Sequence, residues 1–168
     1  MGQNDNLIED YRNLVTNILL ENPTIVEVLS DGKLSLEEAD ELMWTHIFPN
    51  QYIPDTITET GSFILYDLSD SVISRVNKTY IEVTLYFWIL THWDMPKYKH
   101  SLRNDILARE LRKDFGEKDC FGIAKSHYVS NQIYNSGTNK YTARLLTFRI
   151  TDWSDKIRYK SLCINIIC

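Results

Sequence analysis

Apolar and polar residues alternate along Tyr80 to Thr91, and this alternation is the clearest signal in the chain. Successive side chains of a β-strand point to opposite faces, so the pattern predicts a long strand with one face on a core. The apolar face carries Ile81, Val83, Leu85, Phe87 and Ile89, and the other face carries Tyr80, Glu82, Thr84, Tyr86 and Trp88. Tyr and Trp concentrate where an apolar body meets a polar rim. The second face therefore predicts either a partner surface or aromatic residues that lie under helices of the same chain.

Helical spacing marks the N-terminal part of the chain. Apolar residues of 6–21 recur at intervals of three and four, which predicts an amphipathic helix that ends at Asn22-Pro23. Further on, Ser35 and Glu38 have the form of a capping box, which predicts a second, short helix from Leu36 to about Met43 or Trp44.

A third helix is predicted over residues 102–115, with Ser101 as its N-cap and Gly116 as its C-terminal stop. Its expected buried side consists of Ile106, Leu107, Leu111 and Phe115. Its charged residues have mixed signs and predict a solvated face, which consists of Arg103, Asp105, Arg109, Glu110, Arg112, Lys113 and Asp114.

Two pairs of strands complete the pattern. Residues 62–68 and 80–91 form one predicted antiparallel hairpin, and residues 122–134 and 141–152 flank a loop-forming segment at 135–139. The fold class is therefore α+β: an antiparallel sheet of two hairpins, packed by helices in α-β-β-α-β-β order, with a short extra helix near the N-terminus.

Composition agrees with a single globular domain over residues 1–168. A net charge of −5 lacks the basic footprint of a nucleic-acid-binding protein. Aromatic residues make up 12% of the chain, an excess that suggests an interface. The odd set Cys120, Cys163 and Cys168 has no CxxC spacing, which favours reduced thiols in a cytosolic compartment. The longest apolar run is too short to span a membrane.

Candidate chemistry is sparse. No hydrolase, metalloprotease or phosphate-binding loop motif is present. His92, Asp94 and His100 share one loop, but nothing in the sequence fixes them as ligands. We therefore expect no catalytic residue, no bound metal and no cofactor.

Three carboxylates on or beside the first hairpin support an alternative function, that of a metal-dependent nuclease. They are Asp55, Asp67 and Glu82. In such nucleases a strand Glu is followed by a Lys two residues later, whereas here Glu82 is followed by Val83 and Thr84. The missing Lys and the acidic net charge argue against this alternative.

Several local sequences resemble a known family. They are IPDTIT at 53–58 before the first strand, the long strand at 80–90, and LRNDIL at 102–107. With the order of elements, they make a core of about residues 51–153 that resembles the tail-terminator and tail-completion proteins in the neck of tailed bacteriophages. Residues 154–168 form a C-terminal tail beyond that core.

The resemblance implies a structural protein without enzymatic activity. Such proteins form a homo-oligomeric ring, usually a hexamer, that caps the tail tube and joins it to the head–tail connector. The expected location is the virion, after synthesis in the bacterial cytoplasm, with no membrane partner and no sequence-specific nucleic acid, although DNA can pass through the ring.

A ring subunit needs two complementary surfaces. The candidate interface residues are the outward aromatics of the long strand and the isoleucines of the tail: Tyr80, Tyr86, Trp88, Ile164, Ile166 and Ile167. The remaining alternatives are the nuclease and a small regulatory binding protein, which would be monomeric.

Overall fold

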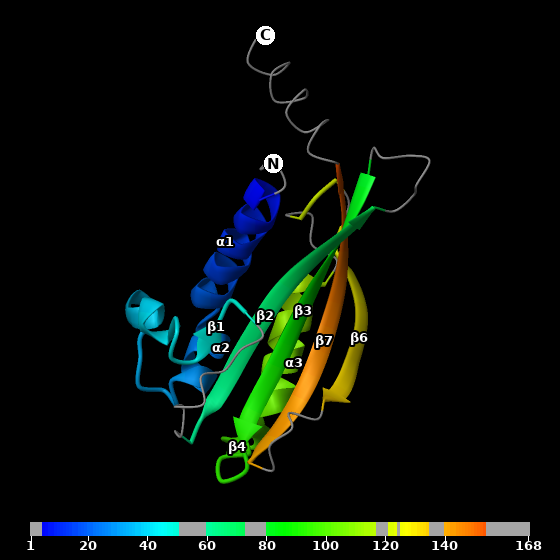
Figure 1. The fold of residues 1–168 in the computed structure, drawn as a ribbon. Helices are drawn as coiled ribbons and strands as arrows, with labels where there is room; N and C mark the ends of the chain where they lie inside the picture. The colour runs from blue at the N-terminus through cyan, green and yellow to red at the C-terminus, as the bar shows by residue number, and fades with distance from the viewer. Residues whose placement is uncertain are drawn as a thin grey trace.

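The computed structural model describes residues 5–50, 60–72, 80–116, 121–123, 125–134 and 140–153. Figure 1 shows a twisted sheet with helices packed beside and behind it. The helical elements are α1 (Asp5–Glu21), α2 (Pro23–Leu29), the 3₁₀ helix η1 (Leu36–Leu42) and α3 (Arg103–Phe115). The strands are β1 (Ile47–Phe48), β2 (Ser62–Val72), β3 (Tyr80–His92), β4 (Lys97–Tyr98), β5 (Ser101–Leu102), β6 (His127–Tyr134) and β7 (Tyr141–Trp153).

The main sheet has the strand order β1-β2-β3-β7-β6. The hairpins β2–β3 and β6–β7 are antiparallel, and β3 joins them by pairing antiparallel with β7 along its whole length. The predicted α+β fold with two hairpins is thus confirmed. The short strand β1 adds a parallel edge beside β2, and β4 pairs with β5 in a separate small hairpin.

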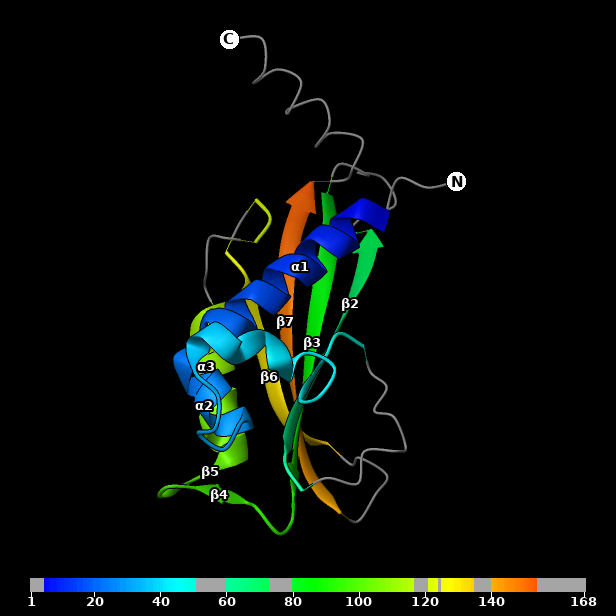
Figure 2. The same ribbon diagram turned by 90° about the vertical axis from the view of Figure 1, so that its left-hand side faces the viewer.

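The helices α1, α2 and α3 pack on one face of this sheet (Figures 1 and 2). The core on that side includes all five apolar residues predicted for the inner face of β3, and four of them are fully buried. Phe87 has its ring centroid 4.8 Å from that of Phe115 on α3 and 5.9 Å from that of Phe148 on β7. The face assignment of the long strand is therefore confirmed.

The sequence prediction missed α2. The Asn22 side-chain oxygen accepts hydrogen bonds from the backbone N–H groups of Thr24 at 2.9 Å and Ile25 at 3.1 Å. Pro23 occupies the first turn, where its missing N–H group costs nothing. The residues that end α1 therefore also start a second helix, which turns the chain back over the sheet.

Three further boundaries differ from the prediction, and the first is that of β2, which runs to Val72 rather than ending at residue 68. Helix α3 begins at Arg103 with Leu102 as N-cap, because Ser101 is instead held in β5 opposite Tyr98. The strand β6 begins at His127 rather than at residue 122, because the chain turns at Gly122, where φ is +64°. The capping box of Ser35 and Glu38 is present, although η1 is a 3₁₀ helix.

The expectation of a solvated face was wrong for Glu110, which is buried, and for Arg103. Its side chain is only 3% exposed, and the guanidinium donates hydrogen bonds to the backbone oxygens of Val28 at 2.7 Å and Lys97 at 3.2 Å. It also forms an ion pair with Asp31 and lies over the Tyr98 ring. Arg103 thus joins the start of α3 to the end of α2, while the other three cations of α3 are exposed as predicted.

No helix in the described part of the chain is long and apolar enough to cross a membrane. The segment 53–58, Asp55, Cys120 and the C-terminal tail with Ile164, Ile166 and Ile167 lie outside the described residues.

Candidate interaction surface

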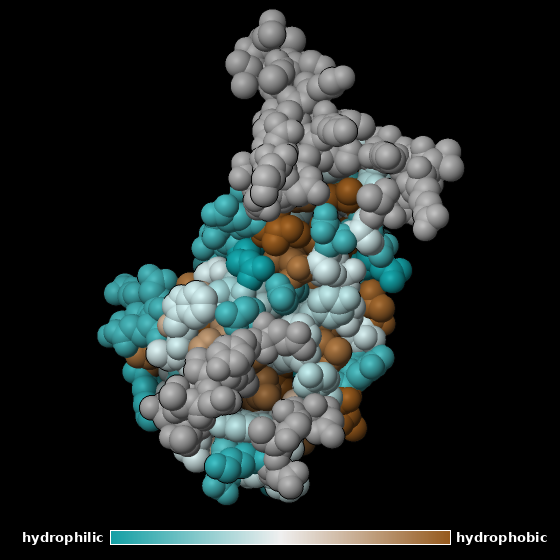
Figure 3. All heavy atoms as spheres, in the orientation of Figure 1, coloured by the Kyte–Doolittle hydropathy of each residue, from teal (hydrophilic) through white to brown (hydrophobic). Residues whose placement is uncertain are grey.

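The face of the sheet opposite the helices, called the outer face below, carries a second and smaller apolar cluster. Its buried members are Phe48, Phe63, Leu65, Trp88, Leu90 and Ala143, and its half-buried members are Tyr86, Tyr134, Tyr141 and Leu145. All of these come from strands, and none of the described helices contributes to the cluster. Figure 3 views this side and shows pale residues, the colour of Tyr, Trp, Ser and Thr, together with brown apolar patches over the middle of the sheet.

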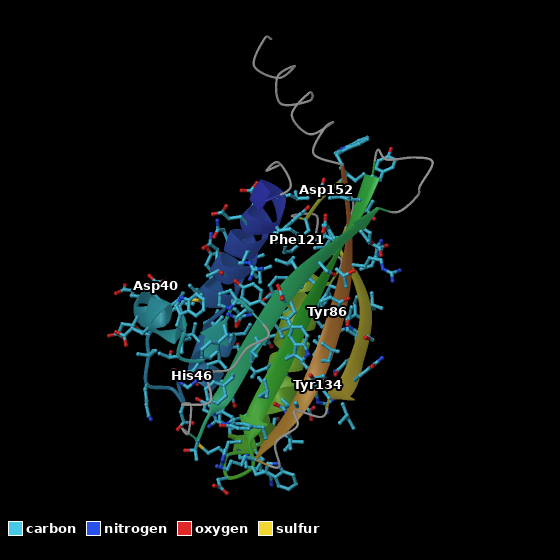
Figure 4. The ribbon with its side chains drawn as sticks, in the orientation of Figure 1. Asp40, His46, Tyr86, Phe121, Tyr134 and Asp152 are labelled. Carbon is cyan, nitrogen blue, oxygen red and sulfur yellow. The ribbon has the colours of Figure 1, made fainter. Side chains whose placement is uncertain are left out.

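Aromatic rings meet along this cluster. Tyr86 stacks on Trp88 with ring centroids 5.8 Å apart and planes inclined by 26°. Trp88 in turn makes an edge contact with Tyr134 of β6 at 6.5 Å. Figure 4 shows Tyr86 and Tyr134 on neighbouring parts of the sheet. Toward the β1 edge, Phe63 lies between Phe48 and Tyr141, and burial raises the pKa of the Tyr141 hydroxyl.

Trp88 itself is mostly covered, since only 7% of the residue is exposed. Its indole N–H is buried and is the one buried side-chain polar atom of the described residues without a hydrogen-bond partner. Tyr86, which is half-buried, is therefore the more accessible of the two predicted contact residues.

Tyr80 lies apart from these two residues. It is eight positions before Trp88 on the same strand, a distance of roughly 27 Å, and its ring packs instead against Trp153, with centroids 4.8 Å apart. A polar band separates the aromatic rings around Trp88 from the pair formed by Tyr80 and Trp153. In this band Arg149 forms an ion pair with Glu82 at 3.1 Å. The outer face thus has an aromatic half around Trp88 and a polar half that ends at Tyr80.

The structure describes two of the three carboxylates of the nuclease alternative, Asp67 and Glu82, and it does not bring them together. Asp67 pairs in register with Tyr86, whereas Glu82 pairs with Ser71, four positions further along. Asp67 forms an ion pair with Arg12 at 3.1 Å, so both carboxylates already have a cationic partner.

The histidine-containing loop likewise forms only a local contact. His92 Nδ1 lies 3.5 Å from an oxygen of Asp94, and the His92 ring packs against Tyr141. Across the described residues, no three His, Cys, Asp or Glu side chains are grouped closely enough to hold a metal ion.

A second surface feature, a basic groove between α3 and β6, was not predicted. Its volume is about 550 Å³, and it is lined by Arg109, Arg112, Lys113, Gly116, His127 and Tyr128. The guanidinium of Arg112 lies over the Tyr128 ring, 4.5 Å from its centroid. The helical spacing of the three cations was visible in the sequence, but their position beside β6 depends on how α3 crosses the sheet.

These features define an α+β protein with helices on one side of its sheet and an aromatic surface on the other. The family model of YomW matches residues 11–150, which include nearly all the described elements, and the chain belongs to the YomW family. This is a family of Bacillus phage type, so the chain is a phage-related protein. A search of curated proteins found no significant match.

Proposed function

We propose that this protein is a structural component of the bacteriophage neck, a tail-terminator or tail-completion subunit. Its copies assemble into a ring, most simply a hexamer, that caps the tail tube and joins it to the head–tail connector. The subunit is made in the bacterial cytoplasm and becomes part of the virion, and DNA passes through the ring without being read for sequence. The phage type of the family and the resemblance of the core to neck proteins support this proposal.

The observation that carries the proposal is the aromatic half of the outer face. An outward-facing aromatic cluster without a described helix over it is the kind of surface that protein interfaces use, because large rings supply much contact area with few rotatable bonds. The half-buried Tyr86 is its best-placed contact residue, and the stacked Trp88 holds the Tyr86 ring in position.

The mass of the purified protein in solution tests the proposal. Native mass spectrometry should detect a closed oligomer, six times the 19.7 kDa chain for a hexamer, and negative-stain images should show rings with an open centre. A monomeric mass at every concentration, without rings, would contradict the proposal and would favour a small regulatory binding protein.

A separate assay addresses the nuclease alternative. Incubation with plasmid DNA and Mg²⁺ or Mn²⁺ should leave the DNA intact. Cleavage that disappears in Glu82→Gln and Asp67→Asn variants would instead assign the strand carboxylates to a metal-dependent reaction.

A further inference from the structure

The basic groove between α3 and β6 carries a net positive charge in a protein that is acidic as a whole. Arg109 Nε and Lys113 Nζ lie 3.2 Å and 3.6 Å from the carboxylate of Glu110, which the helix buries. That carboxylate balances only one of the three cations, and Arg112 has no carboxylate partner among the described residues.

The groove is suited to carboxylate ligands. Stacking on the Tyr128 ring holds the Arg112 guanidinium in one orientation. Its N–H groups point outward in the plane of the guanidinium, where they can bind a carboxylate. The side chains of Arg109 and Lys113 are 68% and 71% exposed, so they can turn toward a ligand in the groove.

An acidic segment with matching properties lies elsewhere on the same chain. Four residues of η1 are acidic and exposed, and no ion pair with a described cation involves any of them: Glu37, Glu38, Asp40 and Glu41. In a 3₁₀ helix, side chains three positions apart lie one above the other, so these residues form two stacked like-charged pairs. Only Glu38 has a structural task, since its carboxylate accepts hydrogen bonds from Ser35.

Exposed apolar residues lie beside the acidic segment and on β6, the strand that adjoins the groove. Leu36 and Trp44 lie beside the acidic residues and are 50% and 62% exposed. On the other side, Val129 and Ile133 of β6 are 45% and 90% exposed. Apolar residues next to complementary charges are the usual composition of a specific protein contact.

The two surfaces lie at opposite edges of the sheet. The segment η1 leads directly into β1 at one edge, whereas the groove adjoins β6 at the other. Figure 1 shows η1 far from β6, and Figure 4 places Asp40 on the outer side of η1. One molecule cannot bring the two surfaces together, but two molecules placed side by side can.

We propose that the groove between α3 and β6 binds the η1 segment of a second copy of this chain. This inference rests on the proposed ring and names the contact that would build it. Each subunit offers η1 to one neighbour and the groove to the other, a head-to-tail arrangement that closes into a ring when the rotation between subunits allows it. Arg112 and Lys113 meet Asp40 and Glu41, and Trp44 packs on the exposed apolar residues of β6.

Charge reversal on either side tests this contact in the full-length chain. Arg112→Glu/Lys113→Glu and, separately, Asp40→Lys/Glu41→Lys should each raise the dissociation constant of the oligomer by about 100-fold or more, measured by sedimentation velocity. An equimolar mixture of the two variants should assemble again, because each contact then joins opposite charges. The variant Lys97→Glu/Lys140→Glu makes the same change in net charge outside the groove and should assemble like the wild type.

Each other outcome has a definite meaning. If the wild type forms rings that neither reversal weakens, the groove is not the subunit contact, although the ring itself stands. If the wild type stays monomeric, both the ring and this contact are wrong. If the Arg112→Glu/Lys113→Glu variant forms the same oligomer as the wild type but loses affinity for a DNA oligonucleotide that the wild type binds, the groove binds nucleic acid. That result overturns the proposed contact.

Discussion

The hydroxyl of Tyr11 on α1 donates a 2.6 Å hydrogen bond to the buried carboxylate of Asp152 on β7, across 141 residues of sequence. This bond ties the first helix to the last described strand. The variant Tyr11→Phe should lower the free energy of unfolding by about 1–3 kcal/mol, because it leaves a buried carboxylate oxygen without this donor. Urea denaturation measures the change. Tyr134→Phe, on the outer face, is the control and should change stability by about 0.5 kcal/mol or less.

Phe87 lies at the centre of the helix-covered core. Its truncation to Ala should cost about 3–5 kcal/mol, since the ring fills space between α3 and β7 that the backbone cannot close. Thermal and urea unfolding should both show the loss. Thr84→Ala, on the outer face of the same strand, should leave the free energy of unfolding nearly unchanged. An equal loss of stability in the two variants would show that the helix-covered face is not the main core.

Arg103 should be far more sensitive than the other cations of α3. Replacement by Ala leaves two backbone carbonyl groups without donors and Asp31 without its partner, and should cost about 3–5 kcal/mol. Arg109→Ala, with a largely exposed side chain, should change stability by about 0.5 kcal/mol or less. Similar losses in the two variants would contradict the structural role of Arg103.

The Tyr66 hydroxyl should make the fold sensitive to alkali. Burial raises the pKa of Tyr66 above its ordinary value of 10.0, although the hydrogen bond with Thr16 at 2.5 Å opposes the shift. Because the folded-state pKa is the higher one, the unfolded chain loses its proton first. Stability is therefore complete below pH 10 and falls as the pH rises through the folded-state pKa. The variant Tyr66→Phe should show a smaller decline in unfolding free energy over the same alkaline range, whereas an unchanged pH profile would assign the decline to other groups.

Tyr86 should matter for assembly and not for folding. Tyr86→Ala should retain a cooperative unfolding transition but weaken the ring or its attachment to the tail tube by about 2 kcal/mol or more, as aromatic interface residues commonly do. Trp88→Ala should instead destabilise the subunit, because Trp88 is buried within its own chain. Native mass and denaturation curves of both variants separate the two effects. Normal assembly of Tyr86→Ala would place the interface elsewhere.

Local patterns predicted the secondary structure well where one requirement dominated. The alternation along β3 identified its inner face, because an apolar core admits only one of the two faces. Asn22-Pro23 was harder, because the same two residues can end one helix and cap the next. Whether a second helix follows depends on whether the next residues can pack as a helix against the sheet, which the local sequence does not specify.

The candidate surfaces depend on long-range geometry that no local pattern contains. Arg103 resembles the other cations of its helix in sequence, and only the return of α2 toward α3 gives it carbonyl groups to bind. The basic groove likewise needs His127 and Tyr128 beside α3, a placement set by the crossing of the helix over the sheet. Tyr80, Tyr86 and Trp88 looked equivalent along one strand face, but their neighbours on β6 and β7 divide them into separate environments.

The two edges of the sheet differ in how they can be extended. The strand β1 is only two residues long and offers little template for another chain, while β2 beside it continues past its two paired residues to Val72. The β6 edge is eight residues long, and among the described strands only β7 pairs with it. Free subunits that are not yet assembled can therefore recruit foreign strands along the whole length of β6. Overproduction of the isolated protein should favour aggregates that grow from β6, and a Pro or Lys substituted for Ile133 should suppress them.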